Sequence, residues 1–391
     1  MKRIIFLSAI ILLLSNLPIY GANPFTNEST MEEYYENSMQ SPDYTLNKAV
    51  IKGIVYDDTK EERDIPIEAD IRYQHLEIEI YSGPHKGEEL TIRHTIERLM
   101  PGVYEFKTGD KILLRITEKN DTIETVRIQE KVRDTWIYLA IGLFVLLLII
   151  GKLNGLKALL SLTVTILLFL FAYIPMIIKG LNPLLSSIGI SILSIVLMLF
   201  IISGFHIKTY VAITGTALGV VFSGLIALFF GHMAQLTGLA SDNSISLAFI
   251  PQFRHLDYRG LLFGTIIIGA IGAIMDVAIS IASAMWEIRE IHPHVTEKEL
   301  IRSGMNIGKD IMGSMSNTLI LAYIGTTLHL IILFSVYQYY FMEIINLDSI
   351  GTEIIRAMSG SIGLILTIPI TVWIAAKIFL KKPSSSAVGK K

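Results

Sequence analysis

A single carboxylate, Asp276, lies near the middle of an apolar stretch that runs from Gly260 to Met285. A charge at the centre of a membrane helix costs roughly 2.5–3.5 kcal/mol on insertion scales, so such side chains normally face a bundle interior or a water-filled cavity. A carboxylate in that setting can bind a proton, a cation or a small polar solute. Asp276 is therefore the first candidate functional residue.

Small and polar residues surround Asp276 on one face of the helix that this stretch predicts. At 100° per residue, the positions within about 40° of Asp276 are Thr265, Gly269, Gly272, Ser280 and Ser283. One interpretation is that these residues only allow close helix packing, with the aspartate hydrogen-bonded inside the seam. We favour a polar functional cavity, because hydroxyl groups suffice for packing and a carboxylate exceeds that need.

The next apolar segment carries a second face of the same kind. Its members, which lie within about 40° of one another on a helix, are Asn306, Asp310, Gly313 and Asn317. Asn317 is expected at about the depth of Asp276, and its amide can donate a hydrogen bond to the carboxylate. The sequence thus predicts one shared mid-membrane site. Lys309 and Asp310, nearer the boundary, are expected mainly to cap and anchor the helix, since lysine can snorkel there.

The composition is that of a membrane protein. Hydrophobic residues make up 52% and charged residues 17% of the 391 residues, and the mean hydropathy is +0.54, whereas soluble domains carry roughly 25% charged residues. A net charge of −2 argues against a nucleic-acid partner. The absence of cysteine excludes disulfides, thiolate nucleophiles and cysteine metal sites.

Apolar runs near the ~20 residues needed to cross a bilayer begin after Arg133. The seven predicted spans are 135–151, 157–178, 183–203, 209–231, 260–285, 311–335 and 358–379. If the chain enters from outside, twelve lysine and arginine residues fall in inner loops and the C-terminal tail, against four in the outer loops after the first span. This asymmetry predicts a cytoplasmic C-terminus. Small-residue stripes in the fourth and seventh spans are most simply packing faces.

The N-terminal part is expected to lie outside the cytoplasm. Residues 1–22 resemble a signal peptide, with Lys2 and Arg3 before an apolar run, although an uncleaved anchor stays open. Residues 23–44 have the composition of a flexible linker. In 45–130, apolar and polar residues alternate at Leu76–Ile80 and again at Ile112–Ile116, which predicts a small extracytoplasmic β-barrel or sandwich. The membrane domain is assigned to 131–391.

Basic residues of the predicted β domain could form a binding face for a partner protein. They are Arg72, His85, Lys86, Arg93 and His94. A solvated sheet surface is the simpler interpretation, because acidic residues alternate with them.

Enzymatic functions find little support. His292 and His294 lie near Glu287 and Glu290, but the His-Glu-x-x-His spacing of a zinc site is missing, so a solvated loop is favoured. No phosphate-binding loop of the Gly-x4-Gly-Lys-Ser/Thr kind occurs. Intramembrane aspartyl proteolysis would need a second carboxylate at the depth of Asp276, and none is expected there. We therefore predict no cofactor and no metal.

Three segments resemble the YibE/F family of bacterial multipass membrane proteins. They read GAIMDVAISIASAMWEI, HPHVTEKELIRSGMNIGKDIMGSMSNTLILAYIG and YSGPHKGEELTIRH. The resemblance extends over about residues 45–380. It implies a bacterial plasma membrane and family motif positions at Asp276, Gly308, Asp310, Gly313 and Asn317. It implies no activity, because none is established for that family.

Two function classes remain from the sequence. The first is a permease or channel in which Asp276, Asn317 and the adjoining Ser/Thr face bind a proton, a cation or a small polar solute. The second is a non-transporting membrane scaffold or regulator, whose outer β domain binds a partner and whose polar cluster only fixes helix pairing. Many transporters contain an internal repeat, and none is evident between the two halves of this sequence. We favour the permease or channel.

Overall fold

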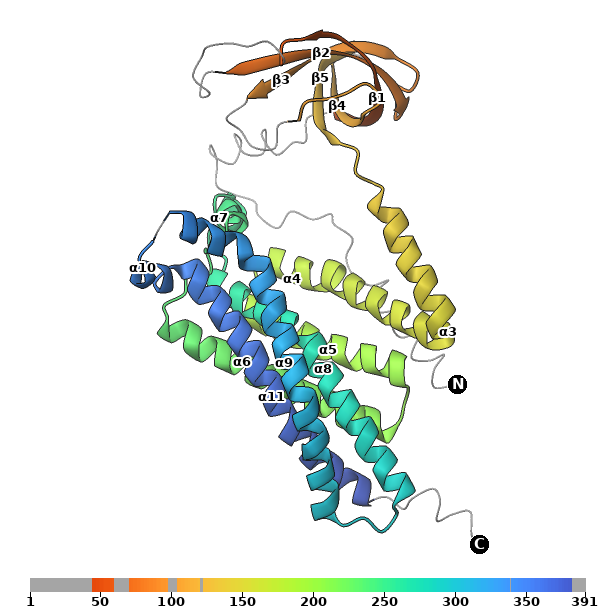
Figure 1. Cartoon of the computed structure of the whole chain (residues 1–391), viewed down its shortest axis with the longest axis vertical. Helices are drawn as coiled ribbons and strands as arrows, with labels where there is room; N and C mark the ends of the chain where they lie inside the picture. Colours follow the sequence, from red (N-terminus) through yellow and green to blue (C-terminus); the bar gives the residue numbers. More distant parts are fainter. Residues whose placement is uncertain (1–43, 60–69, 98–103, 120–121, 338, 382–391) are drawn as a thin grey trace. The chain divides into compact units, whose positions relative to one another are not determined.

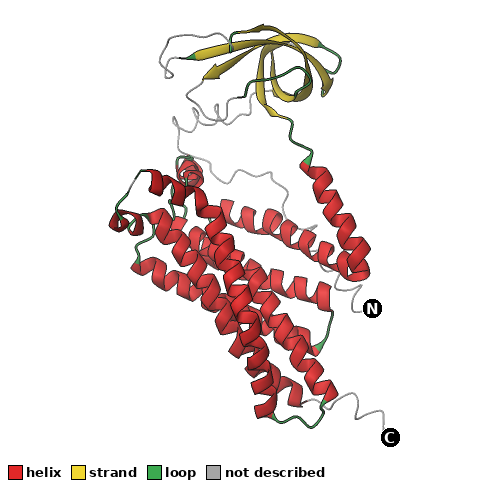
Figure 2. Cartoon of the chain, in the orientation of Figure 1, coloured by secondary structure: helices red, strands yellow, loops and turns green. Residues whose placement is uncertain are grey.

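The computed structural model describes residues 44–59, 70–97, 104–119, 122–337 and 339–381. The predicted signal peptide and all but the last residue of the predicted linker lie outside these residues. The described residues form two compact units, divided between Leu143 and Phe144. The first is built on β-strands and the second is helical (Figure 2).

The first unit contains one five-stranded antiparallel sheet. Its strands are β1 (Tyr44–Asp57), β2 (Ile71–Ser82), β3 (Glu89–Glu97), β4 (Lys111–Lys119) and β5 (Thr122–Lys131). Their order is β3-β2-β1-β4-β5, so that β1 is central and each edge is a hairpin. The sheet curls strongly, as Figure 1 shows. Of the two architectures that the sequence left open, the described strands form the barrel-like one, as an incompletely closed half-barrel.

Alternating apolar residues form the core of this sheet. Leu76, Ile78 and Ile80 of β2 are buried and so are the alternating apolar residues of β4, as the period of two predicts. They pack together from both sides of β1, where Ala49 lies opposite Ile80 and Ile112. Register shifts near Gly53 interrupt the pairing of β1 with β2. Such bulges bend a strand, which accounts for part of the curl.

Arg72 is a buried residue, so the prediction that it belongs to an exposed basic face is wrong. Only 1% of Arg72 is exposed. Its guanidinium binds both carboxylate oxygens of Asp70, with Nη2 3.1 Å from Oδ2, and Nη1 donates to the carbonyl of Asp58 at 2.9 Å. The alternation of β2 places Arg72 on the same face as Leu76. Its burial is sustained by this bidentate pairing.

His85, another member of the predicted basic face, interacts with acidic residues within the sheet unit. Its Nδ1 lies 3.0 Å from Glu88 and its Nε2 lies 2.9 Å from Glu118. The two carboxylates raise the pKa of His85 because both stabilise the charged imidazolium. The side chain thereby ties the β2–β3 turn to the end of β4 rather than presenting a free cation.

We expect Asp70→Ala to destabilise the β unit strongly. The change leaves the buried Arg72 guanidinium without its carboxylate, which typically costs about 3–5 kcal/mol. Urea unfolding of residues 44–131 expressed alone measures the effect. Glu79→Ala is the matched control, because its ion pair with Lys52 is solvent-exposed and should matter little. Equal midpoints for the two variants would contradict the role of the buried pair.

The second unit is built from helices. The elements from Trp136 onward are α3 (Trp136–Leu168), the π-helix η2 (Phe169–Tyr173), α4 (Ile174–Ile178), α5 (Pro183–Ser203), α6 (Ile207–Met233), α7 (Asp242–Ala248), the 3-10 helix η3 (Pro251–Phe253), α8 (Tyr258–Ile291), α9 (Glu297–Val336), α10 (Phe341–Ile345) and α11 (Asp348–Lys381). Six helical segments of the described chain are long and apolar enough to cross a membrane. The chain is therefore a helical polytopic membrane protein.

The first of these six segments, Trp136–Ile178, contains two of the seven predicted spans. It is broken at Lys152, whose φ of 47° and ψ of −124° are not helical. Gly155 then lies against the backbone of Leu147, a contact that requires the chain to fold back and leaves no room for a side chain. Figure 1 shows this reversal within α3. The two arms correspond to the predicted spans 135–151 and 157–178.

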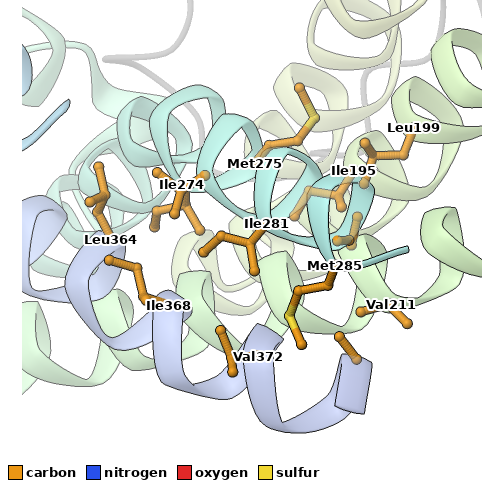
Figure 3. Packing of buried hydrophobic residues seen from close by; sticks show 14 of the residues in the cluster. Ile195, Leu199, Val211, Ile274, Met275, Ile281, Met285, Leu364, Ile368 and Val372 are labelled. Atoms are coloured by element: carbon orange, nitrogen blue, oxygen red, sulfur yellow. The ribbon is translucent and has the colours of Figure 1, made fainter. Parts of the chain in front are cut away.

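The core of the helical unit is formed by α5, α6, α8 and α11. Figure 3 shows side chains from these four helices interdigitating, with Ile195 and Val211 on one side and Ile281 and Ile368 on another. Helices α6 and α11 pack especially closely through small residues. Gly215 faces Thr371, Gly219 faces Thr367, and Gly363 faces Ser223. The predicted small-residue stripes of the fourth and seventh spans are thus packing faces, and they pack on each other.

Candidate functional site

The polar face of α8 is exposed on the helical unit. We call it the Asp276 stripe; it consists of Thr265, Gly269, Gly272, Asp276 and Ser280, all of which are exposed. The residues on either side of the stripe, such as Met275 and Val277, are buried. The structure therefore brings these five residues together on one surface, whereas Ser283, which the sequence assigned to the same face, is half-buried.

Asp276 makes no hydrogen bond or ion pair with any other residue that the structure describes. Thr265, by contrast, donates to the carbonyl of Leu262 in its own helix at 2.7 Å. A hydroxyl can satisfy itself in this way, but an ionised carboxylate is only an acceptor and needs an external donor, a cation or a proton. Asp276 is thus the one member of the stripe that its own helix cannot satisfy.

Different helices flank the Asp276 stripe on its two sides. On one side, Gly264 packs against Ser187 of α5 and lies near the hydroxyl of Tyr173. Toward the other side, the hydroxyl of Tyr323 in α9 lies 3.2 Å from the position that a Cβ would take at Gly269. These contacts hold α8 in place. Tyr323 approaches the stripe at Gly269, and the described part of the chain leaves Asp276 itself exposed.

The polar face of α9 is exposed as well. Asn306, Asp310, Gly313 and Asn317 all lie on the surface of the helical unit. Gly308, about half a turn around the helix from Asn317, is buried against Ile368 and lies near Ile281. Within the described chain no hydrogen bond joins Asn317 to Asp276, so the two polar faces are separate surfaces of one copy.

The depth of Asn317 follows from two contacts between α8 and α9. Gly308 lies beside Ile281, and Tyr323 lies beside Gly269. Interpolation between these contacts places Asp276 level with Ser314, and Asn317 about one turn further along α9. The same interpolation places Ser280 about level with Asp310.

The four glycines that the sequence singled out on α8 and α9, namely Gly269, Gly272, Gly308 and Gly313, have different surroundings. A Cβ at Gly308 would collide with Ile368, and one at Gly269 would press on the Tyr323 hydroxyl. At Gly272 and Gly313, no atom lies within 4 Å of the position of an added Cβ. Gly308 is therefore required for packing, whereas Gly272 and Gly313 leave open space on the two polar faces.

A charged pair near the start of α11 was missed by the sequence analysis. Arg356 Nη1 binds Glu353 Oε1 at 2.5 Å, and both side chains are largely buried. The other oxygen of Glu353 is buried without a partner among the described residues. Tyr323 is close enough to interact electrostatically with both groups. Opposite charges three residues apart were the available signal, but the predicted seventh span begins only at residue 358, after both of them.

The arrangement can bind a polar or positively charged species. The described residues contain no group of three or more His, Asp or Glu side chains placed to hold a metal ion. Asp276 supplies one unpaired carboxylate, and Thr265 and Ser280 supply hydroxyl oxygens on the same stripe.

Helices of this length and apolarity, with one carboxylate on an open polar stripe, define a multipass membrane protein. The family pattern described as YibE/F-like protein matches residues 139–381, and that of the YibE/F family N-terminal domain matches residues 44–131. The chain belongs to the YibE/F family. Neither a curated protein nor a solved structure gives a significant match.

We expect Gly272→Ala to leave the protein folded and Gly219→Ala to destabilise it. Both positions lie in apolar helices, but the added methyl group enters open space at Gly272 and collides with Thr367 and Ile274 at Gly219. Overpacking of this kind typically costs about 1–3 kcal/mol. Thermal stability of the detergent-purified variants measures the difference. If Gly219→Ala were as stable as Gly272→Ala, the close α6–α11 packing would be refuted.

Proposed function

We propose that this chain is a permease or channel of the bacterial plasma membrane for a small polar solute or an ion. Asp276 is the central binding residue, and Thr265 and Ser280 contribute hydroxyl oxygens. Asn317 and Asp310 remain predicted members of the site. The observation that carries the proposal is the unpaired carboxylate of Asp276, exposed on a stripe whose two sides are packed by other helices.

The energetic argument favours a functional role over a packing role. In the α6–α11 interface, Thr216 and Thr367 bond to carbonyls of their own helices at 2.7 and 2.8 Å, and small residues provide the close approach. No carboxylate is needed for that packing. A charge kept at the centre of an apolar helix, at a cost of roughly 2.5–3.5 kcal/mol, is better explained by a species that it binds.

The orientation is part of the proposal. The excess of lysine and arginine in alternate loops supports a cytoplasmic C-terminus and an extracytoplasmic β domain after a signal segment. The break of the first helical segment at Lys152 supports seven crossings, because it turns that segment into two arms. Lys152 and Lys157 at this turn fit a cytoplasmic position.

Asp276→Asn should reduce ion or solute flux to the level of empty liposomes while the protein stays folded. The amide preserves the shape of the side chain and removes its charge. The measurement is flux through purified protein in liposomes under a pH gradient, with a fluorescent proton indicator and a panel of labelled polar solutes. Asp276→Glu should retain part of the flux. Asp242→Asn, in the short helix α7 outside the stripe, is the matched control and should behave as wild type.

The alternative, a non-transporting scaffold or regulator, makes the opposite prediction for the same experiment. If the wild-type protein gives no flux above that of empty liposomes, the permease proposal is rejected. A wild-type flux that Asp276→Asn leaves unchanged would remove Asp276 from the site. An interhelical hydrogen bond in a membrane is worth on average only about 0.6 kcal/mol, so a purely structural Asp276 should tolerate the change.

A reporter that is active only in the cytoplasm tests the orientation. Fused after Lys391, it should be active, because seven crossings that start outside end inside. The same reporter fused to a chain that ends at Lys131 should be inactive. A stable but inactive fusion at Lys391 would disprove either the number of crossings or their direction.

A further inference from the structure

The two exposed polar faces of this chain have complementary hydrogen-bonding groups at matching depths. On α8, Asp276 offers acceptor oxygens and Ser280 offers a donor hydroxyl. On α9, Asn317 offers a donor amide and Asp310 offers acceptor oxygens. Asp276 lies within about one turn of the depth of Asn317, and Ser280 lies at about the depth of Asp310. Each acceptor on one face therefore has a donor at a comparable depth on the other face.

These faces do not pair within one copy. Asn317 lies about half a turn around α9 from Gly308, whose neighbours are Ile281 of α8 and Ile368 of α11. Asp276 and Asn317 are nevertheless expected at membrane depth, where lipid cannot satisfy a carboxylate or an amide. Each face needs a protein surface or water against it.

Small residues make both faces suitable for close helix contact. Gly272 on α8 and Gly313 on α9 have no atom within 4 Å of the position of an added Cβ. Small residues spaced along a helix allow a second helix to approach closely in a membrane. The open space at these two glycines is at the centre of each face.

We propose that the α9 polar face of a second copy of this chain covers the Asp276 stripe, so that Asn317 of the second copy completes the site at Asp276. This contact covers the Asp276 stripe of one copy and the α9 polar face of the other, and it brings together the residues that the sequence predicted to share a site. The ligand class implied is a proton or a small cation, held between the Asp276 carboxylate and the amide and hydroxyl oxygens around it. This extends the proposed function and rests on it for the role of Asp276.

Asp310 is the group that could oppose this contact. It lies about one turn inward from the level of Asp276, and two carboxylates at that separation repel each other. Lys309 is adjacent to Asp310 and is also exposed, so its ammonium group can offset the second charge. The net charge brought by the α9 face is then close to zero.

Cysteine crosslinking tests the contact directly, since the chain has no native cysteine. Two differently tagged full-length chains, one carrying Gly272→Cys and the other Leu321→Cys, are co-expressed and treated with a short bifunctional reagent in native membranes. Leu321 is exposed on the α9 polar face, and both Asp276 and Asn317 are retained. We expect a crosslinked product that contains both tags, several-fold more abundant than with the control pair Leu218→Cys and Leu321→Cys.

The control separates a specific contact from random collision. Leu218 is exposed near the middle of α6, so it reports encounters at a similar depth. Equal yields for the two pairs would overturn the inference, as would a complete absence of mixed product. Gly272→Phe gives a second test: the ring enters open space in one copy, so folding is expected to persist, but it should block the contact. Retention of crosslinking between Thr265→Cys and Leu328→Cys chains that also carry Gly272→Phe, with Asp276 and Asn317 kept, would contradict the proposal.

The outcome is independent of transport. Crosslinking without flux would support the contact and reject the permease. Flux that depends on Asp276 without crosslinking would support the permease and reject the second copy as the source of Asn317.

Discussion

The hydrocarbon core of a membrane offers no hydrogen bonds, and this constraint limits where the polar side chains of the helical unit can lie. Threonine and serine can donate to a carbonyl one turn back in their own helix, as Thr216 and Thr367 do. They can therefore lie in the tight α6–α11 interface without a partner from another helix. An ionised carboxylate cannot donate a hydrogen bond to a carbonyl of its own helix, because it is only an acceptor. Asp276 is accordingly the residue whose position requires something outside its own helix.

The β unit buries its polar groups in a different way. Without disulfides, it depends on a core of alternating aliphatic residues and on a buried ion pair at one end of the sheet. The bidentate Arg72–Asp70 pair is expensive to break but adds little net stability compared with an apolar pair. The pair instead fixes the start of β2, since the guanidinium also donates to the carbonyl of Asp58, which follows β1.

Periodicity predicted the elements well, because a period of two or of 3.6 is set by backbone geometry alone. The buried faces of β2 and β4, the small-residue contacts of α6 and α11, and the composition of the Asp276 stripe all follow from it. Arg72 was misplaced because residue type argued for the surface, whereas its position in the alternation put it inside. Helix α11 begins before the predicted start of the seventh span at residue 358, and the pair between Arg356 and Glu353 allows it to continue through both charges.

The direction in which a helical face points is the part that a single sequence cannot supply. A helical wheel correctly grouped Asn306, Asp310, Gly313 and Asn317, and comparable depth with Asp276 followed from counting along the helix. Which neighbour lies opposite that face depends on packing: Gly308 is buried against Ile368, so the polar face turns away from α11. Two residues touch only if they lie at the same depth in the membrane and their helical faces also point toward each other. For a chain with two such faces, pairing between copies satisfies both, whereas pairing within one copy would require α9 to rotate by about half a turn and expose Leu300, Gly304 and Gly308.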